Sequence, residues 1–112
     1  MNLTTQEGRD IMTYEYRILQ TPIANPWCFR SFSEAMECKK FNRNNYVSVW
    51  SGNVEAGSIN EALYKLDVLF NADDRPNGKH SRSLSMSDIV TLNGVPYYCD
   101  SVGYSEISKE KW

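Results

Sequence analysis

The sequence predicts an α+β fold, in which a mostly antiparallel sheet of four to five strands carries two helices packed on one face. Segments that alternate apolar and polar side chains are typical of strands with one buried face. Two S-x-x-E sequences, each followed by apolar side chains at helical spacing, predict helices. An Asn-Gly dipeptide between two apolar runs predicts a C-terminal β-hairpin. The expected order is β-α-β-α-β-β.

The first strand is expected where regular alternation begins. Residues 1–12 are polar and aperiodic, so we expect a flexible N-terminal extension followed by a single α+β domain over 13–112. The run 14–19 alternates apolar Tyr, Tyr and Ile with polar Glu and Arg, which is the period of a half-buried strand. A chain of 112 residues is close to the commonest domain size, so one core is sufficient.

A short helix and a second strand follow. Ser31 and Glu34 fit a capping box, in which the serine accepts a backbone N–H and the glutamate reaches back. We expect this helix to end near Phe41. The run 46–51 is rich in β-branched and aromatic residues and predicts a strand, and 52–57 predicts a loop.

The second helix is the clearest element in the sequence. Ser58 and Glu61 form another S-x-x-E sequence. Apolar side chains then follow with the spacing of one helix face at Ile59, Ala62, Leu63, Leu66, Leu69 and Phe70. Residues 71–79 are polar and predict a loop.

The last third predicts a hairpin. Residues 88–92 and 95–100 flank Asn93-Gly94, the favoured dipeptide of a type I′ turn. A further strand is expected over 104–107, after a bend.

Composition narrows the classes of function. The net charge of −2 and the pI near 5.3 disfavour nucleic acid as the main partner, because duplex affinity comes largely from neutralising phosphates. No apolar run approaches the roughly 18 residues that cross a bilayer, and no apolar signal segment begins the chain, so we expect no membrane partner. Cys28, Cys38 and Cys99 are an odd number without CxxC spacing, which predicts reduced thiols and a cytoplasmic protein.

Motifs for bound groups are missing from the sequence. One histidine and three scattered cysteines lack the spacing of a zinc site. Neither GxGxxG nor GxxxxGK[ST] occurs. We therefore expect neither a metal nor a cofactor.

A catalytic set can be assembled around the single histidine. Cys99 or a serine could act as nucleophile, His80 as base, and Asp88 or Asp100 as the orienting acid. The flanking motifs of known nucleophile families are missing, and a cysteine on an apolar strand is usually packing material. We expect the protein not to be an enzyme. The alternative is a small enzyme or nucleic-acid-acting factor that uses the region of His80, Cys99 and Asp88.

Aromatic and basic residues near the hairpin are the candidates for protein contact. Tyr97 and Tyr98 face opposite sides of their strand, so we expect one in the core and one exposed. Exposed tyrosine is a typical contact anchor, although tyrosine on a sheet surface is also common without any function. The candidate contact residues are His80, Arg82, Tyr97, Tyr98 and Tyr104. Self-association through an open sheet edge is compatible with either function.

The C-terminal third carries a family resemblance. It contains Ser85-Met86-Ser87-Asp88, then a hydrophobic strand, then Tyr97-Tyr98-Cys99-Asp100-Ser101 with Gly103-Tyr104. This arrangement resembles the YodL-like family, whose pattern is SxSD, a strand, and a YYxDSxGF-like ending. The similarity extends more weakly over 14–107. It implies a non-enzymatic accessory or interaction module of bacteria or mobile elements with an unidentified protein partner, and it supplies no catalytic residues.

Overall fold

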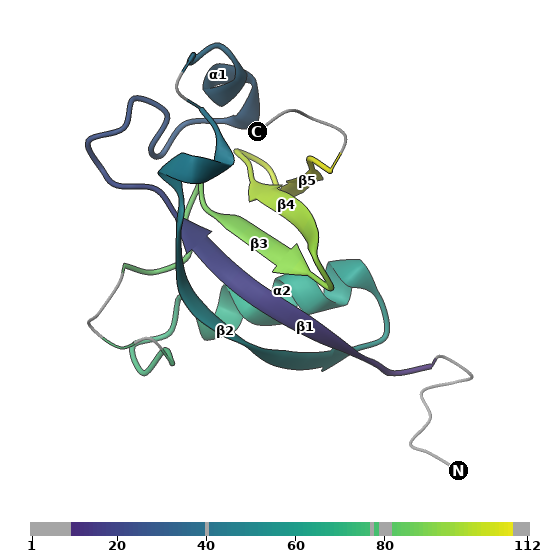
Figure 1. Cartoon of the computed structure of the whole chain (residues 1–112). Coiled ribbons are helices and arrows are strands. Elements are labelled where there is room, and N and C mark those ends of the chain that lie inside the picture. Colours follow the sequence, from purple (N-terminus) through teal and green to yellow (C-terminus); the bar gives the residue numbers. More distant parts are fainter. Residues whose placement is uncertain (1–9, 40, 77, 79–81, 109–112) are drawn as a thin grey trace.

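A computed structural model describes residues 10–39, 41–76, 78 and 82–108. These residues form a five-stranded antiparallel sheet, in the order β2-β1-β3-β4-β5, and two α-helices (Figure 1). The predicted α+β class is therefore confirmed. The elements are β1 (Met12–Gln20), α1 (Phe32–Met36), a 3-10 helix (Arg43–Asn45), β2 (Val47–Ala56), α2 (Ile59–Leu69), β3 (Ile89–Leu92), β4 (Val95–Cys99) and β5 (Tyr104–Glu106).

The two helices lie on opposite faces of the sheet, so the prediction of both on one face is wrong. Helix α2 runs behind the sheet in Figure 1, where Leu66 packs in one core with Val90 and Tyr97. Ala35 of α1 packs in a second core with Tyr98. Neighbouring side chains of a strand point to opposite faces, so β4 contributes to both cores.

Helix α1 is shorter than predicted, because it ends at Met36 and not near Phe41. Its capping box is formed: the Ser31 hydroxyl accepts the N–H of Glu34, and the Glu34 carboxylate accepts the N–H of Ser31. Tighter turns follow the helix. They bring Phe41 into the core, where its ring lies edge-on to Trp27 with 5.6 Å between the centroids.

Strand β2 is longer than predicted and continues through the expected loop. Gly52 pairs with Tyr16, and the ladder extends to Ala56. A Cβ on Gly52 would lie 2.9 Å from the hydroxyl oxygen of Tyr16. The glycine therefore makes room for a buried aromatic ring inside a strand and does not mark a turn.

We expect Gly52→Ala to lower the free energy of unfolding by about 1–2 kcal/mol. Overpacking destabilises a folded protein by about 1–3 kcal/mol. Replacing glycine by alanine also lowers the conformational entropy of the unfolded chain, which stabilises the folded state by about 0.4–1 kcal/mol and offsets part of this loss. Tyr16 cannot move freely because its ring also packs edge-on against Phe70. Urea denaturation measures the change, with Ser51→Ala as the matched control. Full stability of Gly52→Ala would show that the ring does not need this glycine.

Helix α2 and the hairpin agree with prediction. The Ser58 hydroxyl accepts the N–H of Glu61 at 3.1 Å, and the Glu61 carboxylate accepts the N–H of Gly57. Asn93 and Gly94 have φ values of 49° and 86°, as a type I′ turn requires.

The start of β1 differs slightly from the predicted boundary. The strand begins at Met12, one residue inside the expected extension, and residues 1–9 lie outside the described part of the chain. Among the helices of the described ranges, none is long and apolar enough to cross a membrane.

Candidate functional site

The sheet face opposite α2 is only partly covered. Helix α1 and the segments beside it close one end of this face (Figure 1). The remainder is an open groove with a volume of about 1070 Å³. Its lining residues are Glu15, Tyr16, Arg17, Leu19, Arg43, Tyr46, Ser48, Ser51, Gly52, Asn53, Thr91, Asn93, Gly94, Val95, Pro96 and Ser108.

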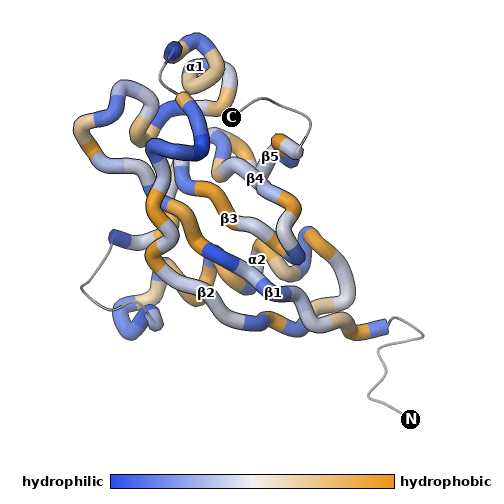
Figure 2. Tube along the Cα trace, viewed as in Figure 1, coloured by the Kyte–Doolittle hydropathy of each residue, from blue (hydrophilic) through white to orange (hydrophobic). Residues whose placement is uncertain are grey.

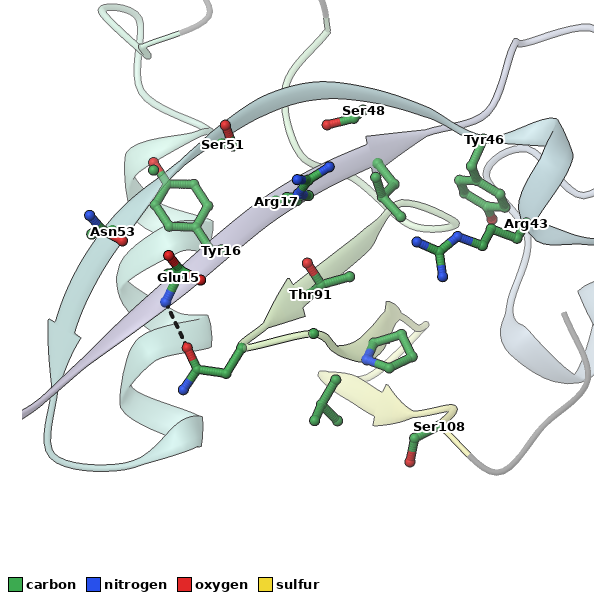
Figure 3. Close-up of a pocket in the computed structure, with 16 residues that line it drawn as sticks. Glu15, Tyr16, Arg17, Arg43, Tyr46, Ser48, Ser51, Asn53, Thr91 and Ser108 are labelled. Atoms are coloured by element: carbon green, nitrogen blue, oxygen red, sulfur yellow. Dashed lines mark hydrogen bonds between the residues drawn. The ribbon is translucent and has the colours of Figure 1, made fainter.

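Polar side chains from three strands form the floor of the groove. Arg17 lies near its centre, with Ser48 and Ser51 of β2 on one side and Thr91 of β3 on the other (Figure 3). Hydrophilic and hydrophobic residues alternate along β1 (Figure 2). This pattern follows from the alternation that the sequence predicted, because Arg17 is exposed while Ile18 is buried.

The half-buried Tyr46 lies at one end of the groove. The Tyr46 hydroxyl donates to the carbonyl oxygen of Ser87 at 2.7 Å and accepts from Trp27 Nε1 at 3.0 Å. Burial raises the pKa of Tyr46, so this phenol stays neutral. Arg43 lies beside it in the lining (Figure 3).

The hairpin turn fixes the other end. Asn93 donates its N–H to the Glu15 carbonyl at 2.7 Å, and its Oδ1 accepts the Glu15 N–H at 2.9 Å. These two hydrogen bonds hold the turn against β1. Two guanidinium groups, of Arg17 and Arg43, and one carboxylate, of Glu15, lie along the groove.

The tyrosines predicted as contact residues are parts of the fold. Tyr97 is 6% exposed and Tyr98 is 0% exposed, so the expectation that one of them faces solvent is wrong. Both faces of the sheet are covered at β4. The Tyr98 hydroxyl donates to the Arg30 carbonyl at 2.8 Å. The half-buried Tyr104 donates to Asp67 Oδ1 at 3.0 Å and so joins β5 to α2.

Arg82, another predicted contact residue, belongs to a buried polar network. Its Nη2 donates to Asp88 Oδ1 at 3.2 Å and to the Thr21 carbonyl at 2.8 Å. Asp88 Oδ2 accepts from the Ser85 N–H at 2.8 Å and from Gln20 Nε2 at 3.0 Å. Burial raises the pKa of Asp88 to about 6, although these bonds and the Arg82 charge partly oppose the shift.

Asp100 has a structural role at the end of β4. Its Oδ1 accepts the N–H of Phe32 at 3.1 Å and that of Ser101 at 2.8 Å, and its Oδ2 accepts the Ser105 hydroxyl at 2.9 Å. Burial raises the pKa of Asp100, but these hydrogen bonds outweigh burial and hold the pKa below its ordinary value. The carboxylate thereby joins the β4–β5 turn to the first residue of α1.

The described members of the predicted catalytic set are poorly suited to nucleophilic chemistry. Burial raises the pKa of the Cys99 thiol to about 11, and only the thiolate is a strong nucleophile. The Asp88 carboxylate is occupied by three donors. His80 lies outside the described residues, so the set stays a prediction.

Cysteine and acidic side chains are the potential metal ligands among the described residues. Cys28, Cys38 and Cys99 are free thiols. Within the described ranges, His, Cys, Asp and Glu side chains form no group of three that could hold a metal ion.

Sequence reasoning missed the groove. Alternation placed Glu15 and Arg17 on the water-facing side of β1, but it gave no sign that this side is concave. The concavity depends on β2, the hairpin turn and the segment around Tyr46, which are distant in sequence.

Comparison with known proteins indicates one family. A family model described as the YodL-like domain matches residues 15–109. This range contains both helices and all strands apart from the first residues of β1. No curated protein and no solved structure shows a significant match. The resemblance found in the sequence is therefore confirmed over most of the chain.

Proposed function

This chain belongs to the YodL-like family, and we propose from that premise that it is a non-enzymatic protein-interaction module of a bacterial or mobile-element protein. Its partner binds in the groove on the open sheet face. The observation that carries the proposal is the shape of this face. A concave surface lined by side chains of β1, β2 and the β3–β4 hairpin is suited to contact with another chain.

The size and openness of the groove favour an extended peptide over a small molecule. Pockets for small ligands usually measure about 300–1000 Å³ and enclose most of the ligand. This groove has a volume of about 1070 Å³ and lies open along the sheet face. Hydroxyl groups at Ser48, Ser51 and Thr91 can bond the backbone of such a segment.

The charges favour an acidic segment. Arg17 is exposed near the centre of the groove and presents a planar guanidinium, which binds carboxylates in a bidentate manner. Arg43 adds a second positive charge, and Glu15 carries the one carboxylate among the described residues that line the groove. Because the whole chain has a net charge of −2, the attraction is a local property of this groove.

Fluorescence anisotropy with two labelled peptides tests the proposal. One alternates Glu and Val over about ten residues, which spans about 33 Å when extended, and the other alternates Lys and Val. We expect the acidic peptide to bind more tightly than the basic one. Arg17→Glu is expected to weaken acidic binding at least about tenfold, which corresponds to about 1.4 kcal/mol.

Arg30→Glu is the matched control, because Arg30 is an exposed arginine outside the groove. We expect it to leave binding nearly unchanged, with folding of each variant checked by circular dichroism. Equal binding of both peptides, or equal effects of Arg17→Glu and Arg30→Glu, would contradict an acidic partner in the groove.

A further inference from the structure

Strand β2 is an open edge of the sheet. It has ten residues, whereas strands usually have about five or six. An edge strand presents backbone N–H and C=O groups that another strand can pair with. The opposite edge, β5, has only three residues and offers little for pairing.

Proline and charged side chains, two of the usual protections of an edge, are scarce along β2. A third protection is present, because the register against β1 shifts at Val49, and a second copy has to accommodate this irregularity. From Val47 to Val54 the sequence holds no proline and no charged residue. Natural edge strands commonly carry lysine, proline or inward-pointing charges that block pairing with other chains. Protection is found at the end of the strand, where Lys65 Nζ donates to the Glu55 carbonyl at 2.7 Å.

Large apolar side chains are exposed on the same strand. Val47 is 58% exposed and Trp50 is 39% exposed. Both would lose water-accessible area if a further strand lay beside β2, which favours association.

We propose that β2 pairs antiparallel with β2 of a second copy of this chain, about a two-fold axis at Ser51. The arrangement joins two five-stranded sheets into one continuous sheet. Glu55 is the one charged residue of β2. The two-fold axis places the Glu55 of one copy opposite Val47 of the other, so like charges do not meet in the ladder.

The pairing has a consequence for the groove. A two-fold axis that relates antiparallel edge strands is perpendicular to the sheet, so the open faces of both copies lie on the same side. Ser48, Ser51 and Asn53 of each β2 line that face. The second copy thus extends the wall of the groove, and one partner carrying two segments can occupy both grooves with increased avidity.

Sedimentation equilibrium of the peptide-free protein tests the dimer. At about 100 µM, which saturates a dimer of micromolar affinity, we expect a mass of twice 12.9 kDa. Ser51→Lys and Ser51→Glu each place two like charges at the two-fold axis, and each should raise the dissociation constant at least about tenfold. Ser101→Lys, an exposed site on the β4–β5 turn, is the control and should stay dimeric.

Mixing the two Ser51 variants shows whether a loss of dimerisation comes from charge repulsion at the two-fold axis or from misfolding of the variants. Lysine then faces glutamate across the axis, so we expect the mixed dimer to form more tightly than either variant alone. A wild-type protein that stays monomeric, or variants that dimerise as well as the wild type, would overturn the proposal. Neither result decides whether a single groove binds an acidic segment, because that binding is measured separately with the Arg17 variant.

Discussion

Asp88→Ala is expected to lower the free energy of unfolding by about 3–5 kcal/mol at neutral pH, the range seen when one partner of a buried ion pair is removed. Asp88 is fully buried, and its carboxylate accepts from Arg82, Gln20 and the Ser85 N–H. Alanine leaves all three donors without this acceptor and creates a small cavity.

Urea denaturation measures this loss. Asp73→Ala, which removes an exposed carboxylate from the loop after α2, is the matched control and should change stability by less than about 0.5 kcal/mol. Asp88→Asn keeps the shape of the side chain, and its single carbonyl oxygen can still accept from one or two of the donors. We expect its stability to lie between those of the wild type and Asp88→Ala. Equal losses at Asp73 and Asp88 would show that the network contributes little.

The pH dependence shows whether burial or pairing dominates at Asp88. Burial raises its folded-state pKa to about 6, above the ordinary value of 3.8 for an aspartate. The folded state therefore holds the proton more tightly, so this group stabilises the fold most below pH 3.8, and the contribution is lost as pH rises to about 6. The wild type should thus lose about 2–3 kcal/mol relative to Asp88→Ala between pH 4 and 7, at 1.36 kcal/mol per pKa unit.

The opposite slope would mean that Arg82 stabilises the carboxylate more than burial destabilises it. Glu34 and Asp100 have lowered pKa values, so they stabilise the fold above their unfolded pKa and lose that effect as pH falls. Both are present in wild type and variant, and their contributions cancel in the difference.

Local patterns in the sequence were sufficient for most elements. The alternation around Tyr16, the Ser58 cap and the Asn93-Gly94 turn each depend on residues within a few positions of one another. Local backbone physics therefore predicts them. The same holds for the polar side of β1, where Arg17 faces water.

Features that depend on distant residues were not predictable in this way. Gly52 looks like a turn residue, and only the ring of Tyr16 on the neighbouring strand explains it. Tyr98 looks half-exposed until α1 and Phe41 cover the second face of the sheet. Which face a helix covers is decided by long-range packing, so the placement of α1 could not follow from its own residues.

The family motif itself is explained by folding. Ser87 accepts the Phe29 N–H, Asp88 binds Arg82 and Gln20, and Asp100 binds the start of α1. Apart from the bond to Arg82, which is six residues away, these bonds join the C-terminal third to segments more than 50 residues away in sequence. A motif of this kind identifies the fold of the family, whereas the groove that we propose for binding is lined mainly by residues outside it.

Tyr98→Ala is expected to lower the free energy of unfolding by about 3–5 kcal/mol, as for other large aromatic side chains removed from a core. The side chain is 0% exposed, and its ring centroid lies 5.1 Å from that of Phe32 and 6.0 Å from that of Phe41. Truncation empties the centre of the core beneath α1. Urea denaturation measures the loss, and a stable Tyr98→Ala protein would contradict the packing described above.

Tyr98→Phe separates this structural role from partner contact. It keeps the ring and removes only the bond to the Arg30 carbonyl, so we expect a loss of about 0.5–1.5 kcal/mol. Because Tyr98 is fully buried, Tyr98→Phe should bind the acidic peptide as tightly as the wild type. Weaker binding in Tyr98→Ala would then report unfolding and not a lost contact. Weaker binding in a folded Tyr98→Phe would instead mean that the partner reaches the β4 core, and the contact surface would have to be moved from the groove to the C-terminal hairpin.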